Sequence, residues 1–125
     1  MGKTVLPLTK SEAVKRHREL WNKIAEIIKK DGIVVHDGYT KYSCSIGIKE
    51  QAAKELDYDT YIMHYCWLCE YKRQHKLTCF ECPIRWSNLF CNDSEYNSFS
   101  RALERGDDKM AYTLAMEIAN LPERN

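Results

Sequence analysis

The sequence has little net charge, little glycine and no long apolar run. Its 19 Lys and Arg residues nearly balance its 18 Asp and Glu residues, which leaves a formal net charge of +1. Proteins that bind bulk polyanions usually carry a strong basic excess, and mimics of DNA are highly acidic, so the composition favours neither class. Any electrostatic recognition must therefore come from a local patch of charge.

The chain also lacks the marks of a targeting or membrane segment. No stretch approaches the ~18 apolar residues of a membrane helix. The apolar stretch at residues 4–8 is too short for a signal peptide, and Leu6 stands where N-myristoylation needs Ser or Thr. We therefore expect a cytoplasmic protein, whose thiols stay reduced.

Several enzyme signatures are missing as well. The five glycines are scattered, so no glycine-rich phosphate loop is present, and no His-Glu-x-x-His occurs. Zinc deaminases place a proline before a Cys-x-x-Cys pair, whereas Pro83 follows such a pair here. The four histidines show no recognisable catalytic spacing. We therefore expect that the chain is not an enzyme.

What the sequence does have is a cluster of cysteines. Of its six cysteines, four form Cys66-x-x-Cys69 and, after nine residues, Cys79-x-x-Cys82. Two residues between thiols let both sulfurs reach one ion, and two such pairs complete a zinc tetrahedron with Zn–S distances of ~2.3 Å. A site of four thiolates has no open position, so the pattern predicts a structural zinc ion rather than a catalytic one.

Other interpretations of these cysteines stay open. The pairs are also compatible with redox dithiols, with plain buried thiols and with an iron–sulfur cluster. Cys91, His64 and His75 are close enough in sequence to replace one of the four ligands. Cys44 lies far from the cluster, and we expect it to be a small buried residue.

The length of 125 residues predicts one domain over residues 1–125. We expect an α+β fold that is mostly α, with helices around a small zinc knuckle and one short β-hairpin. Its parts would be a helix and hairpin at residues 1–57, the zinc knuckle at 58–92 and C-terminal helices at 93–125.

The strongest helix signal covers residues 9–31. Thr9 and Glu12 have the spacing of a capping box, and Gly32 supplies a stop. Apolar residues recur on one helical face in between.

Weaker signals predict the remaining elements. Asp37-Gly38 indicates the turn of a hairpin over residues 33–43. Further helices are expected at 47–56, at 94–104 with Gly106 closing it, and from Asp107 or Asp108 to a point before Pro122. Residues 57–75 predict a helix or helical turn running into the first cysteine pair, and residues 76–92 an irregular loop.

A basic group lies within and beside the knuckle. It consists of Lys72, Arg73, Lys76 and Arg85, interleaved with aromatic residues. Basic residues with aromatics can hold nucleic acid through phosphate contacts and stacking. The competing interpretation is a solvated loop around a zinc site, with the aromatics packed in the small core beside it.

Several of these residues together resemble a known group of proteins. The segments that carry the likeness are His17-Arg18-x-Leu20-Trp21, Cys66-x-Leu68-Cys69-Glu70-Tyr71, Cys79-x-x-Cys82-Pro83-Ile84-x-Trp86, Cys91 and Ile118-Ala119-x-Leu121-Pro122-Glu123-Arg124. They resemble small, mostly uncharacterised zinc-binding proteins of phages and prophages of Gram-positive bacteria. The resemblance covers most of the chain except the hairpin-like middle, and it implies that Cys91 belongs to the motif.

Small phage proteins of this kind include metal-containing anti-CRISPR proteins. The resemblance therefore implies a non-enzymatic, zinc-stabilised protein that binds and inhibits a host defence protein inside the bacterial cell, with a CRISPR effector nuclease as the favoured partner. The alternative is a nucleic-acid-binding zinc module that acts as a transcriptional or DNA-transaction accessory through Lys72, Arg73, Lys76 and Arg85.

Overall fold

The fold consists of five α-helices within the residues that the computed structural model describes, which are 8–33, 45–56, 66–78, 81–86 and 94–123. The helices are α1 (Lys10–Asp31), α2 (Ser45–Glu55), α3 (Trp67–Gln74), α4 (Glu95–Arg105) and α5 (Asp108–Ala119). These ranges contain no strand, only an isolated antiparallel bridge. The mostly α fold class is therefore confirmed, while the hairpin predicted at 33–43 lies outside the described residues except for Ile33.

Helix α1 begins and ends where its sequence signals place it. The Thr9 hydroxyl accepts a hydrogen bond from the Glu12 N–H, and the Glu12 carboxylate accepts one from the Thr9 N–H, both at 3.0 Å. This reciprocal capping box satisfies two of the N–H groups that a helix start leaves unpaired. At the other end Gly32 has a φ of 70°, in the left-handed region that glycine adopts without strain.

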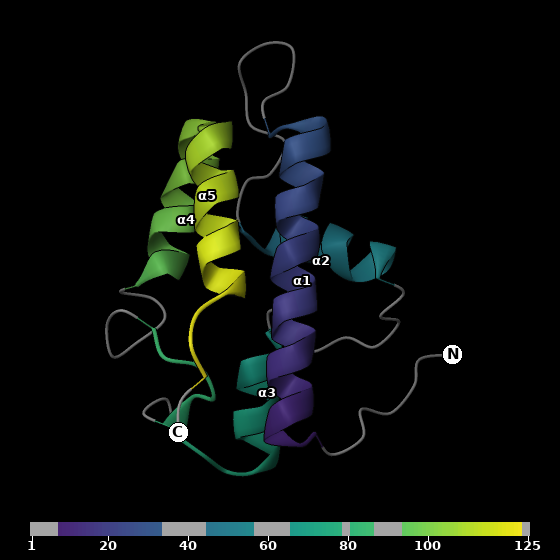
Figure 1. The fold of residues 1–125 in the computed structure, drawn as a ribbon, viewed down its shortest axis with the longest axis vertical. Coiled ribbons are helices and arrows are strands. Elements are labelled where there is room, and N and C mark those ends of the chain that lie inside the picture. The colour runs from purple at the N-terminus through teal and green to yellow at the C-terminus, as the bar shows by residue number, and fades with distance from the viewer. Residues whose placement is uncertain (1–7, 34–44, 57–65, 79–80, 87–93, 124–125) are drawn as a thin grey trace.

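The other helices organise around α1, which runs along the length of the molecule (Figure 1). Helix α5 lies antiparallel to α1 and packs along it, and α4 packs on α5. Two hydrogen bonds between residues far apart in sequence fix this pairing of α1 and α5. The Ile33 N–H donates to the Asp108 carboxylate at 2.9 Å, and the His17 ring bonds to the Ile118 carbonyl at 3.2 Å.

Helices α2 and α3 pack on other parts of α1. Helix α3 lies beside the N-terminal end of α1, and α2 packs on α1 and contacts α4 (Figure 1). A small apolar cluster of Leu8, Ala13 and Trp67 joins the start of α1 to α3. All helices that the structure describes are too short or too polar to span a bilayer.

The main core lies where α1, α2, α4 and α5 meet. Trp21 of α1 stacks edge-on against Phe99 of α4, with ring centroids 4.9 Å apart. Met110 of α5, although apolar, is 44% exposed. It lies in the first turn at the edge of the apolar stripe, and the stripe centres on Ala111, Ala115 and Ile118, which are fully buried.

Candidate metal centre

The first cysteine pair forms the start of α3. Cys66 is the N-cap of the helix, with an extended backbone (φ −112°, ψ 102°), and its Sγ accepts a hydrogen bond from the Cys69 N–H at 3.3 Å. A polar acceptor at an N-cap satisfies an N–H group that has no partner inside the helix. Helix α3 therefore starts at the pair, while residues 57–65 of the helix or helical turn predicted at 57–75 lie outside the described residues.

The surroundings of Cys66 favour its thiolate. Its pKa is lowered to about 6, foremost by a hydrogen bond with the Cys69 side chain, which together with the charges of Lys49 and Lys72 outweighs the opposing effect of burial. The thiolate, not the thiol, is the form that binds metals. Cys66 and Cys69 thus have the spacing and the local chemistry of half a zinc site.

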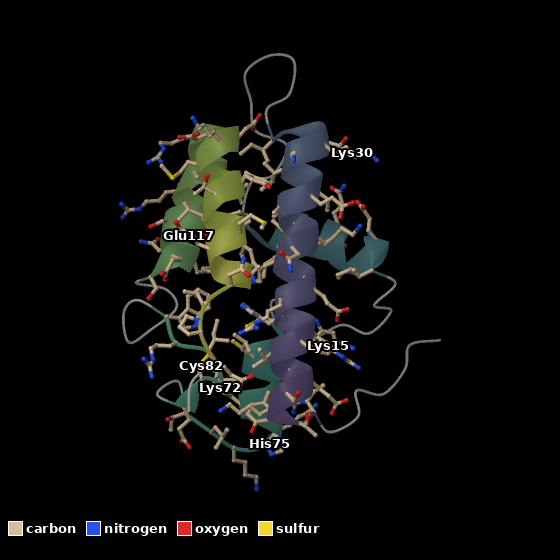
Figure 2. All side chains as sticks on the ribbon, in the orientation of Figure 1. Lys15, Lys30, Lys72, His75, Cys82 and Glu117 are labelled. Atoms are coloured by element: carbon tan, nitrogen blue, oxygen red, sulfur yellow. The ribbon has the colours of Figure 1, made fainter. Side chains whose placement is uncertain are left out.

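Of the second cysteine pair, only Cys82 lies within the described residues. Cys82 is buried at 4% exposure and belongs to the main core. It precedes Pro83 and Ile84, which are also buried. Figure 2 places Cys82 at the end of the molecule that holds α3.

The segment after Cys82 is paired with the C-terminal part of the chain. Ile84 and Glu123 form an antiparallel bridge, and the Arg85 N–H donates to the Pro122 carbonyl at 2.8 Å. The Arg18 guanidinium of α1 also bonds to the Leu121 carbonyl at 3.2 Å. Two segments that carry the phage-protein resemblance are therefore neighbours in space.

The complete four-thiolate site is not assembled from the described residues. Within the described ranges no group of three or more His, Cys, Asp or Glu side chains is arranged to hold a metal ion. Cys79 and the substitute ligands Cys91 and His64 lie outside those ranges, as does Cys44. The three described cysteines of the predicted set, Cys66, Cys69 and Cys82, do not form such a group, and zinc coordination by them together with Cys79 stays a prediction.

His75, a further substitute ligand, is engaged elsewhere. Its Nε2 bonds to the Leu8 carbonyl at 2.7 Å, and the Leu8 N–H donates to the Gln74 side chain, also at 2.7 Å. The His75 ring packs 4.4 Å from the Tyr71 ring. These contacts tie the chain ahead of α1 to the end of α3, which gives His75 a structural role.

The predicted basic group is only partly on the surface. The Lys72 side chain is 9% exposed, and Arg73 forms an ion pair with the buried Glu70. Lys76 and Arg85 are exposed and make no ion pair with any residue that the structure describes.

The two tryptophans near this group face inward. Trp67 and Trp86 are 3% and 7% exposed. The Arg16 guanidinium lies over the Trp67 ring at 4.6 Å and covers it. These rings pack the protein instead of forming a surface on which bases could stack.

Two buried ionisable side chains were not predicted from the sequence, His17 and Lys49. His17 is 3% exposed, and burial lowers its pKa to about 3, so the ring is neutral at physiological pH. Lys49 is likewise 3% exposed. A signal for Lys49 was present, because it stands with Ile48, Ala52 and Ala53 at the spacing of one buried helix face.

Comparison of the chain with protein-family models, with curated proteins and with solved structures gives no match. The resemblance to phage proteins therefore stays an expectation from the sequence. The case for a function rests on the residues of the site.

Proposed function

We propose that this chain is a non-enzymatic, zinc-stabilised phage protein that binds and inhibits a host defence protein in the bacterial cytoplasm. The observation that carries the metal site is Cys66, an N-cap thiol whose pKa is lowered to about 6 one helical turn from Cys69. A half-buried thiol held toward its anionic form is suited to ligating a cation. Zinc is the preferred ion because two Cys-x-x-Cys pairs supply its usual closed tetrahedron.

The fold around α3 explains why a metal would help. Helix α3 has 8 residues, and an isolated helix of that length is marginal in water. The segment at 81–86 has one short turn and a single bridge to Glu123. A zinc ion shared by Cys66, Cys69, Cys79 and Cys82 would join these two segments into one rigid surface.

A binding role also fits the two histidines that the structure describes, because each is hydrogen-bonded to a backbone carbonyl. His17 is buried among Trp21 and Trp86 and bonded to a backbone carbonyl, which is a structural position. His75 is bonded to the Leu8 carbonyl. Neither is placed for proton transfer to a substrate, which supports a non-enzymatic function.

A protein partner is favoured over nucleic acid by the placement of the basic group. Lys72 is buried, and the exposed Arg73 is paired with Glu70, so only Lys76 and Arg85 of the four are exposed cations that make no ion pair with a described residue. Phosphate binding needs several exposed Lys or Arg side chains on one face. The choice of a CRISPR effector nuclease as the partner rests on the sequence resemblance alone.

The metal site is tested by elemental analysis and paired cysteine variants. We expect one zinc ion per chain for the native protein. Cys69→Ser should lose the metal and destabilise the protein far more than Cys44→Ser, which serves as the matched control outside the proposed site. A fully folded, metal-free native protein, or equal effects of the two variants, would rule out the zinc site.

The inhibitory role is tested by DNA cleavage with purified CRISPR effector nucleases. The zinc-loaded protein should form a complex with its target nuclease and suppress cleavage, and Cys69→Ser should not. Complex formation should change little between low and moderate salt, because protein interfaces with an apolar centre depend little on ionic strength. If the protein instead shifts DNA or RNA at low salt, and Lys76→Ala with Arg85→Ala abolishes the shift, the nucleic-acid alternative is correct.

A further inference from the structure

Cys66 and Cys69 form a thiol pair at the first turn of α3. Cys66 is the N-cap, and its Sγ accepts a hydrogen bond from the Cys69 N–H at 3.3 Å. The Cys66 carbonyl accepts another from the Glu70 N–H at 3.0 Å, which closes the first turn of the helix. The Cys66 sulfur therefore lies over the turn that carries Cys69.

The backbone between the two cysteines has the spacing that a disulfide requires. The distance between their α-carbons is set by the two residues between them, Trp67 and Leu68, which are both helical. One such turn puts α-carbons three residues apart about 5 Å from each other, inside the range of roughly 4.4–6.8 Å that disulfides span. A disulfide between Cys66 and Cys69 therefore fits the helix as it stands.

The pair is also accessible and separate from the other cysteine that the structure describes. Cys66 and Cys69 are half-buried thiols, so a small molecule can reach them. Cys82 is 4% exposed and belongs to the main core. Within the described ranges these three cysteines do not come together in a group that could hold a metal ion. Cys66 and Cys69 are thus placed to react with each other.

We propose that Cys66 and Cys69 are a redox-active dithiol that a small-molecule disulfide converts into an intramolecular disulfide. Redox-sensing cysteines are typically accessible, often lie at the start of a helix, and have a resolving cysteine beside them. The inference goes beyond the proposed function and does not need the zinc site. A disulfide would withdraw two of the four predicted zinc ligands, so the pair cannot be oxidised and bind zinc at once.

The oxidation proceeds by two exchange steps. The Cys66 thiolate attacks one sulfur of the small disulfide, which forms a mixed disulfide and releases one small thiolate. The Cys69 thiolate then attacks the Cys66 sulfur, which forms the Cys66–Cys69 bond and releases the second small thiolate. The protein loses two electrons and two protons, and the small disulfide takes up both to become two thiols. Cys66 makes the first attack because the Cys69 N–H donates to its sulfur and stabilises the thiolate.

The test equilibrates the full-length protein with reduced and oxidised glutathione, with and without a chelator. Samples are quenched in acid and alkylated, and their peptides are identified by mass spectrometry. With excess oxidised glutathione we expect Cys66 and Cys69 to lose both alkylation sites through a bond to each other. Return to reduced glutathione should restore both sites, because exchange is reversible.

Two matched variants separate the roles of the two thiols. Cys69→Ser removes the resolving thiol, so Cys66 should keep glutathione as a stable mixed disulfide, which the native protein should not accumulate. Cys66→Ser removes the attacking thiol, and we expect its remaining Cys69 to take up glutathione at least about 10-fold more slowly than Cys66 does in Cys69→Ser.

Three outcomes would overturn the proposal. The pair could stay fully open to alkylation in oxidised glutathione with and without the chelator, the native protein could retain glutathione on Cys66, or either cysteine could bond to Cys82 instead.

Zinc is measured in the same reduced samples, so that the two hypotheses fail separately. A reduced protein without zinc whose pair oxidises reversibly would refute the zinc site alone. A zinc-loaded protein whose pair resists oxidation even after chelation would refute the dithiol alone.

Discussion

At the scale of single residues, His17 shows how burial converts an ionisable side chain into a packing group. Its ring lies 6.5 Å from that of Trp21 and 6.2 Å from that of Trp86, and its Nε2 meets the Ile118 carbonyl. Because that carbonyl accepts, Nε2 carries the hydrogen of the neutral ring. A second proton would place a charge among aromatic rings, so the folded state resists protonation.

We predict that His17 makes the protein sensitive to acid. Its pKa falls from 6.5 to about 3 on folding, so between these values the unfolded chain binds a proton that the folded chain does not. Stability is therefore complete above pH 6.5 and decreases as the pH falls through this window, at up to about 1.4 kcal/mol per pH unit. Urea unfolding across the window, with the non-titrating His17→Gln variant beside the native protein, measures this slope.

The difference between the two proteins isolates His17, because both share the same cysteines and carboxylates. The native protein should lose stability more steeply with acid than His17→Gln. Parallel slopes would contradict a buried neutral histidine.

At the scale of elements, α1 is the clearest case of local sequence fixing a helix boundary. Its capping box satisfies two backbone donors at the start, and the Gly32 N–H donates to the Ile28 carbonyl at 2.8 Å at its end. Its buried face then contacts α2, α3 and α5. A frayed start of α1 would weaken the cluster with Trp67 as well.

Loss of the cap has a predictable cost. Thr9→Ala removes the hydroxyl that accepts from Glu12, and we expect it to lower the free energy of unfolding by about 1 kcal/mol. Ser11→Ala is the control, since Ser11 is exposed in the same turn and should change stability by less than about 0.5 kcal/mol. Denaturant titration compares the two, and equal losses would show that the capping box contributes nothing.

The elements differ in how well the sequence predicted them. Helices α1 and α5 begin with side-chain caps, Gly106 ends α4 in the left-handed conformation, and all three helices have apolar faces, so local signals were sufficient. The start of α3 was missed because cysteine is not among the usual N-cap residues. Helix α2 begins at Ser45, slightly ahead of the predicted 47–56.

Of the candidate site, only the spacing of the cysteines along the sequence could be predicted. The pattern of cysteines pointed to Cys66 and Cys69, but the burial of Lys72 and the pairing of Arg73 with Glu70 depend on how α3 packs against the rest of the chain. Sequence spacing carries no information on that packing. The same holds for Lys49, whose burial follows from the contacts of α2 with α1 and α4.

At the scale of the whole molecule, the proposed metal centre lies at one end of the apolar core. Large buried side chains such as Phe99, Leu20 and Ile118 gather along α1, α4 and α5. The end that holds α3 joins this core through Leu68, Cys82 and Ile84, and it adds a smaller cluster, the hydrogen bonds to Leu8 and the bridge to Glu123. We therefore expect the two parts to respond differently to loss of metal.

Chelation should loosen the α3 end first. After treatment with a chelator, amide hydrogen exchange should rise over residues 66–78 and 81–86, while α1, α4 and α5 keep their protection. Adding zinc back should restore the slow exchange. Unchanged exchange, or a uniform rise over all helices, would mean that no metal selectively supports this end.

The pairing of α1 with α5 has a consequence for synthesis of the protein. His17 and Ile118 are bonded across 101 positions of sequence, and the segment at 84–85 is paired with 122–123. While the ribosome extends the chain, α1 emerges early, but the part of its apolar face that α5 covers has to wait for α5. We expect this part of the face to stay exposed on the nascent polypeptide until α5 has left the exit tunnel.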